Sequence, residues 1–374
     1  MRIVHIADCY LPRLGGIEVQ VDGLARAQQA QGHEVHIITA TRTETRDQPE
    51  LAGGVQIHRH GFPLPADLPL HPRGFRVLSQ VVSEVKPDVV HVHVGSVSFY
   101  SWSGIRAARG AGLPVITTVH SMWGPVARRL FWLANRLVGW SNWTVLTAVS
   151  TAAALPVAQA ASLPAAEVFI TSNGVDLDGW APLHPVEDLT GPLRLVSATR
   201  FAPRKRVLPL IEMMAQLKAV LGDDCPSLTI VGNGPALERA RARVRQLGIE
   251  NTVNLPGRVD RATLANLYAQ SSAFIQLSVR ESFGLAAIEA RAAGLPVLGR
   301  AGNGFSEFIT SGTDGYLEPS DAGVKARLIH LVERPEVLKA MREYARLHPP
   351  LNTWELALAQ VQRAYEAAIG HGLR

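Results

Sequence analysis

The residues best suited to chemistry in this chain lie between Arg280 and Val297. Two glutamates, Glu281 and Glu289, stand eight positions apart, and an Ala- and Leu-rich run that predicts a helix follows Gly284. A helix N-terminus attracts anions, because its first N–H groups are unpaired and the positive end of its dipole lies there. One carboxylate before such a helix and another about two turns along it suit the hydroxyls of a polyol whose phosphates lie on those N–H groups. The pattern indicates a nucleotide sugar, and it is also typical of a buried amphipathic helix with one glutamate favoured by the dipole.

A second group of charges follows the predicted strand at residues 193–198. Four cations stand there in a short segment: Arg200, Arg204, Lys205 and Arg206. Arginine offers a fork of donors and lysine a point charge, and together they suit a diphosphate. A solvated basic loop has the same composition, but the position at the end of a strand favours ligand binding.

Histidines form a third set of candidates. His120 ends the predicted strand 115–119, where a neutral imidazole can bond a substrate hydroxyl or can simply cap the strand. His91 with His93, and His58 with His60, each have the spacing of two that places both rings on one face of a sheet. No cluster of Cys, Asp or Glu accompanies either pair, so a metal site is not the favoured interpretation.

Two glycine loops follow predicted strands. Gly15 and Gly16 come after the first strand and let the backbone approach a ligand closely. Gly232 and Gly234 resemble the start of a dinucleotide fingerprint, but position 237 is leucine where the third glycine belongs. This counts against a nicotinamide-dependent dehydrogenase.

Composition sets the general class of the protein. The chain has 374 residues, of which 47% are hydrophobic and 18% charged, so we expect about two globular domains. The two cysteines, Cys9 and Cys225, are far apart and fit no disulfide framework or metal motif. With no signal peptide expected and no apolar run of about 18 residues, the sequence predicts a cytoplasmic protein.

The net charge of +5 is distributed unevenly. Residues 89–166 contain no Asp or Glu, and the segment Val126 to Trp140 combines leucines at helical spacing with Arg128, Arg129 and Arg136. An amphipathic helix of this kind suits an anionic membrane surface at the inner face, or it packs into the first domain with its arginines extended to solvent. Aromatic-interleaved nucleic-acid motifs are absent, so we expect no nucleic-acid partner.

The predicted elements alternate between strands and helices. Apolar β-branched runs at 3–7, 35–38, 89–93 and 115–119 predict one parallel sheet covered on both faces, and runs at 193–198, 228–231, 253–255 and 273–277 predict a second. The segment 173–189 is the expected hinge, and a final helix at about 354–369 is long enough to cross back onto the first domain. We therefore predict an α/β protein with two doubly wound, Rossmann-like domains facing across a cleft.

Taken in order, these pieces resemble the family-4 retaining glycosyltransferases of the GT-B fold, over essentially the whole length. The motifs that carry the resemblance are Pro12–Glu18, Gly32–Val35, Pro87–His93, His120, Asn173–Asp176, Arg200 with Lys205, Val231–Pro235, Gly257–Val259, and Glu281 with Glu289 followed by Ala293–Val297. The Gly-rich loops are weakly specific one by one. The basic pair combined with two glutamates eight apart, before Ala-Gly-Leu-Pro-Val, is a strong signal.

The resemblance implies roles for particular residues. Arg200 and Lys205 would hold the donor diphosphate and stabilise the leaving group, without an obligatory metal or other cofactor. Glu281 would bond the transferred sugar and Glu289 the ribose hydroxyls. The other implied contacts are the backbone of Phe283, Gly284 and Leu285 with Gly16 and Gly234 at the phosphates, His120 at the sugar, Arg258 and Val259 at the base, and Gly15 and Arg204 on the acceptor side.

The same resemblance implies the reaction. A hexose-type sugar would pass from a UDP- or GDP-linked donor to a glycan or lipid-linked acceptor, with retention, and the leaving phosphate would accept the acceptor's proton. A dedicated carboxylate base, as in glycosidases, is therefore not expected. The alternatives are a nucleotide-sugar epimerase of related fold and a non-catalytic module that binds sugar nucleotides.

The expected domains are 1–175, with 353–374 crossing back onto it, and 176–352. Two positions depart from the family's usual pattern. Arg206 stands where glycine commonly follows the lysine, and Leu277 stands where proline often precedes Ser278. Both differences are expected to reshape the site locally without removing a named contact.

Overall fold

A computed structural model of the chain describes residues 1–43, 50–64, 68–180 and 191–370. The chain forms two compact units, the first comprising Met1–Gly174 with Asn352–Arg374 and the second Val175–Leu351. Part of the expected hinge, including Pro182 and Pro185, lies outside the described residues. Each unit has its own sheet and its own core.

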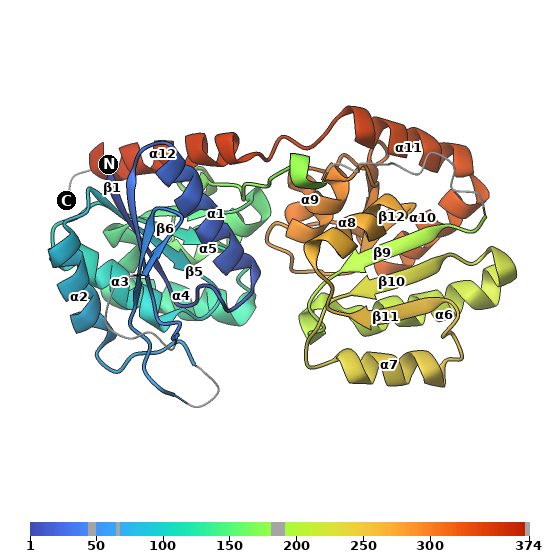
Figure 1. Cartoon of the computed structure of the whole chain (residues 1–374), viewed down its shortest axis with the longest axis horizontal. Coiled ribbons are helices and arrows are strands. Elements are labelled where there is room, and N and C mark those ends of the chain that lie inside the picture. Colours follow the sequence, from blue (N-terminus) through green and yellow to red (C-terminus); the bar gives the residue numbers. More distant parts are fainter. Residues whose placement is uncertain (44–49, 65–67, 181–190, 371–374) are drawn as a thin grey trace. The chain divides into compact units, whose positions relative to one another are not determined.

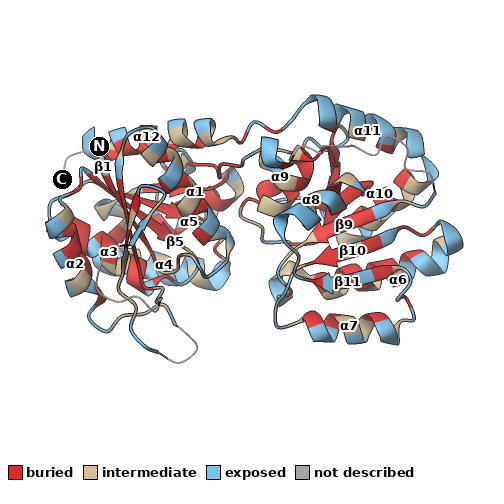
Figure 2. Ribbon diagram, in the orientation of Figure 1, coloured by how far each residue is buried: buried red, intermediate tan, exposed pale blue. Residues whose placement is uncertain are grey.

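The first unit contains an eight-stranded sheet in the order β3-β4-β2-β1-β5-β6-β7-β8. All of its strand pairs are parallel except β3 with β4. Its central strands are buried along their length, which is why they read as continuous apolar runs (Figure 2). The bounds are β1 (Arg2–Ala7), β2 (Glu34–Thr39), β3 (Glu50–Ala52), β4 (Val55–Arg59), β5 (Val89–Val94), β6 (Val115–Val119), β7 (Val145–Ala148) and β8 (Phe169–Ile170).

The C-terminal helix α12 belongs to this first unit. Val361 and Tyr365 of α12 pack with Ile3 of β1 and Leu24 of α1 in one buried cluster, and Figure 1 shows the helix lying along the sheet. The helices of the unit are α1 (Gly16–Ala30), α2 (Gly74–Val85), α3 (Phe99–Gly110), α4 (Pro125–Val138), α5 (Thr151–Ala161) and α12 (Trp354–Gly370), with short 3-10 turns at Trp140–Trp143 and Ala165–Glu167.

The second unit contains a six-stranded parallel sheet in the order β11-β10-β9-β12-β13-β14. Its strands are β9 (Arg194–Ala198), β10 (Ser227–Val231), β11 (Val253–Gly257), β12 (Ala273–Gln276), β13 (Val297–Arg300) and β14 (Gly315–Glu318). Its helices are α6 (Val207–Leu221), α7 (Leu237–Gln246), α8 (Arg261–Ala269), α9 (Leu285–Ala292), α10 (Asp321–Glu333) and α11 (Pro335–Leu347), with 3-10 turns at Asp178–Trp180, Pro203–Lys205, Gly222–Asp224 and Gly304–Glu307.

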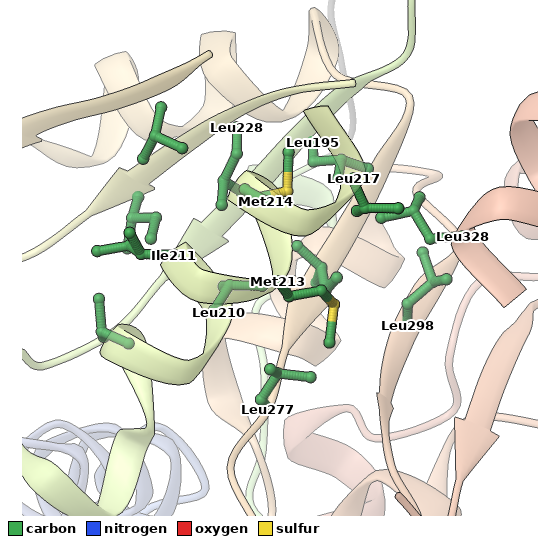
Figure 3. Close-up of a cluster of buried hydrophobic side chains, with 14 of the residues drawn as sticks. Leu195, Leu210, Ile211, Met213, Met214, Leu217, Leu228, Leu277, Leu298 and Leu328 are labelled. Atoms are coloured by element: carbon green, nitrogen blue, oxygen red, sulfur yellow. The ribbon is translucent and has the colours of Figure 1, made fainter. Parts of the chain in front are cut away.

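Helix α6 supplies much of the core of the second unit. Its Met213 and Met214 are buried between Leu195 and Leu228 of the sheet and Leu328 of α10 (Figure 3). Flexible thioether side chains fill the irregular space between sheet and helices. This packing fixes α6, and with it the basic turn that immediately precedes the helix.

The order of the strands indicates where a ligand would bind in each sheet. In the second sheet the order reverses at β9, which lies between β10 and β12, and in the first sheet at β1, which lies between β2 and β5. Ligands of doubly wound sheets bind beyond the carboxyl ends of the strands at such reversals. The prediction of two parallel-sheet, Rossmann-like domains is confirmed, and the segments that follow β9 and β12 lie at the reversal of the second sheet.

The structure differs from the predicted elements in detail. The first helix begins at Gly16 rather than near Val19, because Gly15 is extended at the N-cap and the helix follows at once. Strands β7, β8, β13 and β14 have two to four residues each and were missed by sequence reasoning. Such short apolar runs do not differ in periodicity from buried helix segments.

Candidate active site

The clearest feature of the second unit is an ion pair at the reversal of strand order. Nζ of Lys205, in the turn after β9, lies 2.5 Å from Oε2 of Glu281, in the loop after β12. The two side chains are only 18% and 12% exposed. Neighbouring strands β9 and β12 bring together residues that are 76 positions apart in sequence. The pair places one cation and one carboxylate where a ligand of this fold binds.

Glu281 is held from several sides. Nε2 of Gln276, at the end of β12, donates to Oε2 of Glu281 at 3.0 Å and to the hydroxyl of Ser278 at 2.7 Å. The backbone N–H of Gly304 donates to the carbonyl of Glu281 at 2.8 Å. Sequence reasoning missed Gln276 and Ser278, and the available signal was that they lie at the end of a buried strand and just after it. Together these bonds fix the carboxylate before any ligand arrives.

Helix α9 begins immediately beyond this loop. Gly284 is its N-cap with φ of +100°, a conformation that side chains rarely adopt, and a Cβ there would meet the ring of Phe305 at 2.3 Å. Phe283 is buried, and Leu285 opens the helix. The eight-residue interval to Glu289 is therefore not a helical repeat, because Glu281 precedes the helix and Glu289 lies about one turn into it.

Glu289 is partly buried on α9. Burial raises the pKa of its carboxyl to about 7, and the charge of Arg261 opposes that rise. The guanidinium of Arg261 lies over the ring of Trp180 at 4.8 Å and pairs with Asp176 at 3.0 Å. A carboxyl poised near neutrality can donate as well as accept, and both abilities suit a pair of neighbouring hydroxyls.

The four cations after β9 divide into two groups. Arg200 and Arg204 are exposed and Lys205 pairs with Glu281, so these three lie beside the carboxyl end of the strand. Arg206 instead pairs with Asp321 at the start of α10, which corrects the prediction of a four-cation cluster. Its backbone has φ of +56°, in the left-handed region that favours glycine. That geometry gives a physical reason for the glycine that the family commonly has here.

The glycine loop after β10 packs against the loop after β9. A Cβ at Gly232 would lie 1.9 Å from the carbonyl oxygen of Thr199, and one at Gly234 would lie 2.5 Å from that of Phe201. Because neither glycine has a side chain, the loop after β10 can pack directly against the backbone of the loop after β9. This contact holds the segment that carries Arg200. Beyond β11, Arg258 is exposed and Val259 partly buried, where main-chain groups can meet a ligand.

Three predicted site residues lie in the first unit. Gly15 caps α1 and exposed Gly16 is the first residue of that helix, beyond the carboxyl end of β1. His120 follows β6 and its backbone N–H donates to the carbonyl of Val94 at 2.9 Å. Burial lowers the pKa of His120 to about 4, so its imidazole is neutral at pH 7. His120 and His93 also line a hollow beside α12, with Gln20 and Trp354 on its wall.

The structure adds a third histidine to the pair on β5. His5 of β1 joins His91 and His93, and within the described ranges this trio is the one grouping of three His, Cys, Asp or Glu side chains whose ligand atoms all lie within 4.8 Å. Sequence reasoning did not connect His5 with the pair, because only strand order makes β1 and β5 neighbours.

Helix α4 is the exposed element of the first unit. None of its residues is buried, and Val126, Leu130, Leu133 and Leu137 form one apolar stripe with exposures of 75%, 62%, 48% and 75%. The helix ends at Val138, before the end of the predicted segment Val126 to Trp140. Trp140 and Trp123 instead turn inward, and Trp123 stacks on Phe131 at 4.1 Å. Of the helices described, none is long and apolar enough to cross a bilayer.

Comparison with known proteins agrees with this geometry. The model of glycosyltransferase family 4 matches residues 14–178, and the model of the group 1 glycosyl transferases matches residues 184–348. The fold is that of HepE from Anabaena in complex with UDP and glucose, with a TM-score of 0.76 at 16% identity, covering 98% of this chain and 100% of that one. Sucrose-phosphate synthase from Thermosynechococcus elongatus has a TM-score of 0.75 at 20% identity, covering 99% and 100%.

The fold and the two matched halves thus define a glycosyltransferase of the GT-B type that uses a nucleotide sugar. The chain belongs to the family-4 glycosyltransferases. Among curated relatives, a D-inositol 3-phosphate glycosyltransferase of Jonesia denitrificans is 29% identical, covering 94% of this chain and 91% of the relative. A GDP-mannose-dependent alpha-mannosyltransferase of Mycobacterium tuberculosis is 28% identical, covering 85% and 84%. A phosphatidyl-myo-inositol mannosyltransferase of Mycolicibacterium smegmatis is 25% identical, covering 100% and 96%.

Proposed function

We propose that this protein transfers a hexose from a nucleotide diphosphate sugar to a glycan or lipid-linked acceptor, with retention of configuration. The observation that carries the proposal is the Lys205–Glu281 ion pair at the reversal of the second sheet. A lysine there can balance the charge on the diphosphate, and the glutamate it releases can accept hydrogen bonds from sugar hydroxyls. Arg200 would add a bidentate contact to the phosphates, so we propose that no metal is obligatory.

The N-terminus of α9 would complete the site that binds the donor. Its N–H groups at Phe283, Gly284 and Leu285 suit a phosphate, and Glu289 one turn further along suits the ribose hydroxyls. Without a ligand, Glu281 accepts hydrogen bonds from Lys205 and Gln276, and an ionised acceptor favours a binding role over that of a general base. We therefore propose that the leaving phosphate accepts the acceptor's proton, and that His120 contacts the transferred sugar.

The donor is tested by thermal stabilisation with UDP-, GDP- and ADP-sugars in the presence of EDTA. A donor at 100 times its Kd should stabilise the protein by about 2.7 kcal/mol, so one base should raise the melting temperature and the others should not. The mannosyltransferase relatives make GDP-mannose the first candidate, and the HepE complex with UDP-glucose makes UDP-glucose the second. No stabilisation by any of them would refute the proposed donor class.

Three outcomes separate the alternatives once the donor is known. Release of the nucleoside diphosphate, slow alone and faster with an acceptor, is expected of a transferase. Interconversion of the donor without any acceptor would instead indicate an epimerase, and binding without turnover a non-catalytic module. The anomeric signals of the product, read by NMR, should match the donor's configuration, and an inverted product would overturn retention.

We also propose that α4 binds an anionic membrane surface at the inner face of the membrane. Its apolar stripe is flanked by Arg128, Arg129 and Arg136, all exposed, and no carboxylate lies between residues 89 and 166. An exposed apolar face with cationic flanks gains both from burial at the headgroup boundary and from attraction to anionic lipids. A lipid-linked acceptor would then be within the enzyme's reach.

Co-sedimentation with phosphatidylglycerol-containing vesicles checks this surface. Binding is expected at low salt, should weaken as the salt concentration rises, and should be absent with phosphatidylcholine alone. Leu130→Glu combined with Leu137→Glu should abolish it. Val220→Glu, at an apolar residue of α6 that is 70% exposed, serves as the matched control and should bind normally. No binding of the wild-type protein at low salt would end the proposal.

A further inference from the structure

Glu281 uses only one of its two carboxylate oxygens in the ion pair of the second unit. Nζ of Lys205 lies 2.5 Å from Oε2, and Nε2 of Gln276 donates to the same oxygen at 3.0 Å. Among the described residues none donates to Oε1, and this oxygen is not one of the buried polar atoms that lack a partner. Oε1 therefore keeps contact with solvent and is the oxygen left for a ligand.

The two donors to Oε2 differ in what a bound ligand does to them. In the proposed function Lys205 binds the donor diphosphate, which competes with Glu281 for the same ammonium group. The bond between Lys205 and Glu281 should therefore weaken when a donor binds. Gln276 is uncharged and only 3% exposed, so it stays beside Glu281. After the exchange, Gln276 is the donor that remains on Oε2.

The amide of Gln276 is held in one orientation. Its nitrogen donates to Oε2 of Glu281 at 3.0 Å and to the hydroxyl oxygen of Ser278 at 2.7 Å. An ionised carboxylate can only accept hydrogen bonds, so the amide nitrogen and not the amide oxygen must face Glu281. Turning the amide over would place two acceptors against each other. The partners of Gln276 therefore determine which way its amide points.

Buried bonds to the loop after β13 support this orientation. Gln276 is the last residue of β12 and is paired with Gly299 of β13. The carbonyl of Ser278 accepts from Nδ2 of Asn303 at 3.0 Å, and Oδ1 of Asn303 accepts from the backbone N–H of Phe305 at 3.0 Å. Ser278 and Asn303 are both inaccessible to solvent. The loop after β13 thus holds the residue that orients Gln276.

We propose that Gln276 is a positioning residue that holds Oε2 of Glu281 while the donor diphosphate binds Lys205, so that Oε1 stays available to a hydroxyl of the transferred sugar. The roles of Lys205 and Glu281 in this inference rest on the proposed function. Because Gln276 is almost wholly buried, it acts through Glu281 rather than on the ligand. Gln276 therefore contributes to recognition of the sugar and not to recognition of the nucleoside diphosphate.

A purely structural role is the competing interpretation. A buried amide at the end of a central strand also stabilises the fold, because it satisfies the polar groups around it. The two roles differ in their effect on ligands. Damage to the fold of the loop should weaken the binding of a nucleoside diphosphate and of its sugar derivative alike, whereas loss of positioning should weaken only the contribution of the sugar.

Calorimetric titration of the full chain with GDP, GDP-mannose, UDP and UDP-glucose separates the two roles. The ratio of the Kd of each nucleotide to the Kd of its sugar derivative measures the contribution of the sugar. Gln276→Met keeps the length of the side chain and removes the donor. It should raise the Kd of the nucleotide sugar by about tenfold, the effect of one hydrogen bond to a charged group, and leave the Kd of the nucleoside diphosphate unchanged.

Two further variants keep this measurement specific. Ser272→Ala is the matched control, because Ser272 is a fully buried residue at the other end of β12 whose hydroxyl accepts from the backbone N–H of Arg194 at 2.9 Å. Its loss should lower the melting temperature without changing either Kd. Gln276→Asn, whose amide is one methylene shorter and does not reach Glu281, should bind both ligands as Gln276→Met does.

A second measurement needs no ligand. In Lys205→Met, Gln276 is the only donor to Glu281 left among the described side chains. Adding Gln276→Met should therefore lower the melting temperature by more than the same change does in the wild-type background, because it leaves a mostly buried carboxylate without a donor.

The outcomes are distinguishable. Equal losses of nucleotide and nucleotide sugar in Gln276→Met, or no loss of either, would overturn the positioning role. Additive shifts of the melting temperature would overturn it too, since they would show that Gln276 does not hold the carboxylate. Failure of the wild-type protein to bind any of the four ligands would instead refute the proposed donor class, and the melting temperatures would still decide whether Gln276 holds Glu281.

Discussion

Lys205→Ala is expected to lower the turnover of sugar transfer by about 10²–10³-fold, the usual effect of removing one preorganised donor from a developing anion. Lys205 is the partly buried cation at the carboxyl end of β9, and it already pairs with Glu281 in the absence of ligand. Without it, the leaving diphosphate loses charge stabilisation in the transition state. The loss should therefore fall on kcat more than on KM.

The fold should survive this substitution. Gln276 still donates to Glu281 at 3.0 Å, so the carboxylate keeps a partner when the lysine is removed. Lys325→Ala is the matched control, because Lys325 is a partly buried lysine of α10 whose Nζ donates to the amide oxygen of Gln216 at 2.9 Å. Activity and melting temperature should be measured together. If Lys205→Ala and Glu281→Ala both turned over at near-normal rates, the assignment of this site would be wrong.

Arg291→Met is expected to destabilise the second unit by about 3–5 kcal/mol, the cost of leaving one member of a buried ion pair without its partner. The side chain of Arg291 is 2% exposed and that of Asp314 is 6% exposed. Nε of Arg291 lies 3.0 Å from Asp314, and its two terminal nitrogens donate to the carbonyls of Ala345 and His348. One guanidinium therefore ties α9 to the end of α11 and to the turn before β14.

This substitution also bears on function, because α9 carries Glu289. Hydrogen exchange should become faster in α9 and α11 and stay unchanged in the first unit. Arg291→Met combined with Asp314→Leu should regain much of the lost stability, since it removes both buried charges. Arg334→Met, in a pair that is 64% exposed on both sides, should change stability by less than about 0.5 kcal/mol. A similar loss in both single variants would contradict the argument from burial.

The sequence predicted the layers of the fold because buried parallel strands are continuous apolar runs. It indicated Lys205 and Glu281 as candidate site residues because both follow such runs, and the structure pairs them. It also predicted α4 correctly as an amphipathic helix. The predicted end of that helix was wrong, because Trp140, which follows it, is buried, and apolar aromatic residues suit a membrane and a core equally well.

Pairings between distant residues could not be predicted in the same way. Gln276 and Ser278 hold Glu281 through bonds that depend on how the loop after β12 turns. Arg206 has the same charge and nearly the same position as Lys205, yet it bonds Asp321, because its left-handed backbone turns it away at the start of α6. Local composition does not distinguish these two outcomes.

By itself, the sequence determined the class of chemistry: two sheets, a basic turn after one strand, and two glutamates before and within a helix. These features are local, and each depends on periodicity or on residue type. Only the tertiary structure decided which charges meet, that Glu281 precedes its helix, and that His5 reaches His120 through His93. Those contacts join residues on different strands, and strand order, which sets them, results from packing of the whole unit.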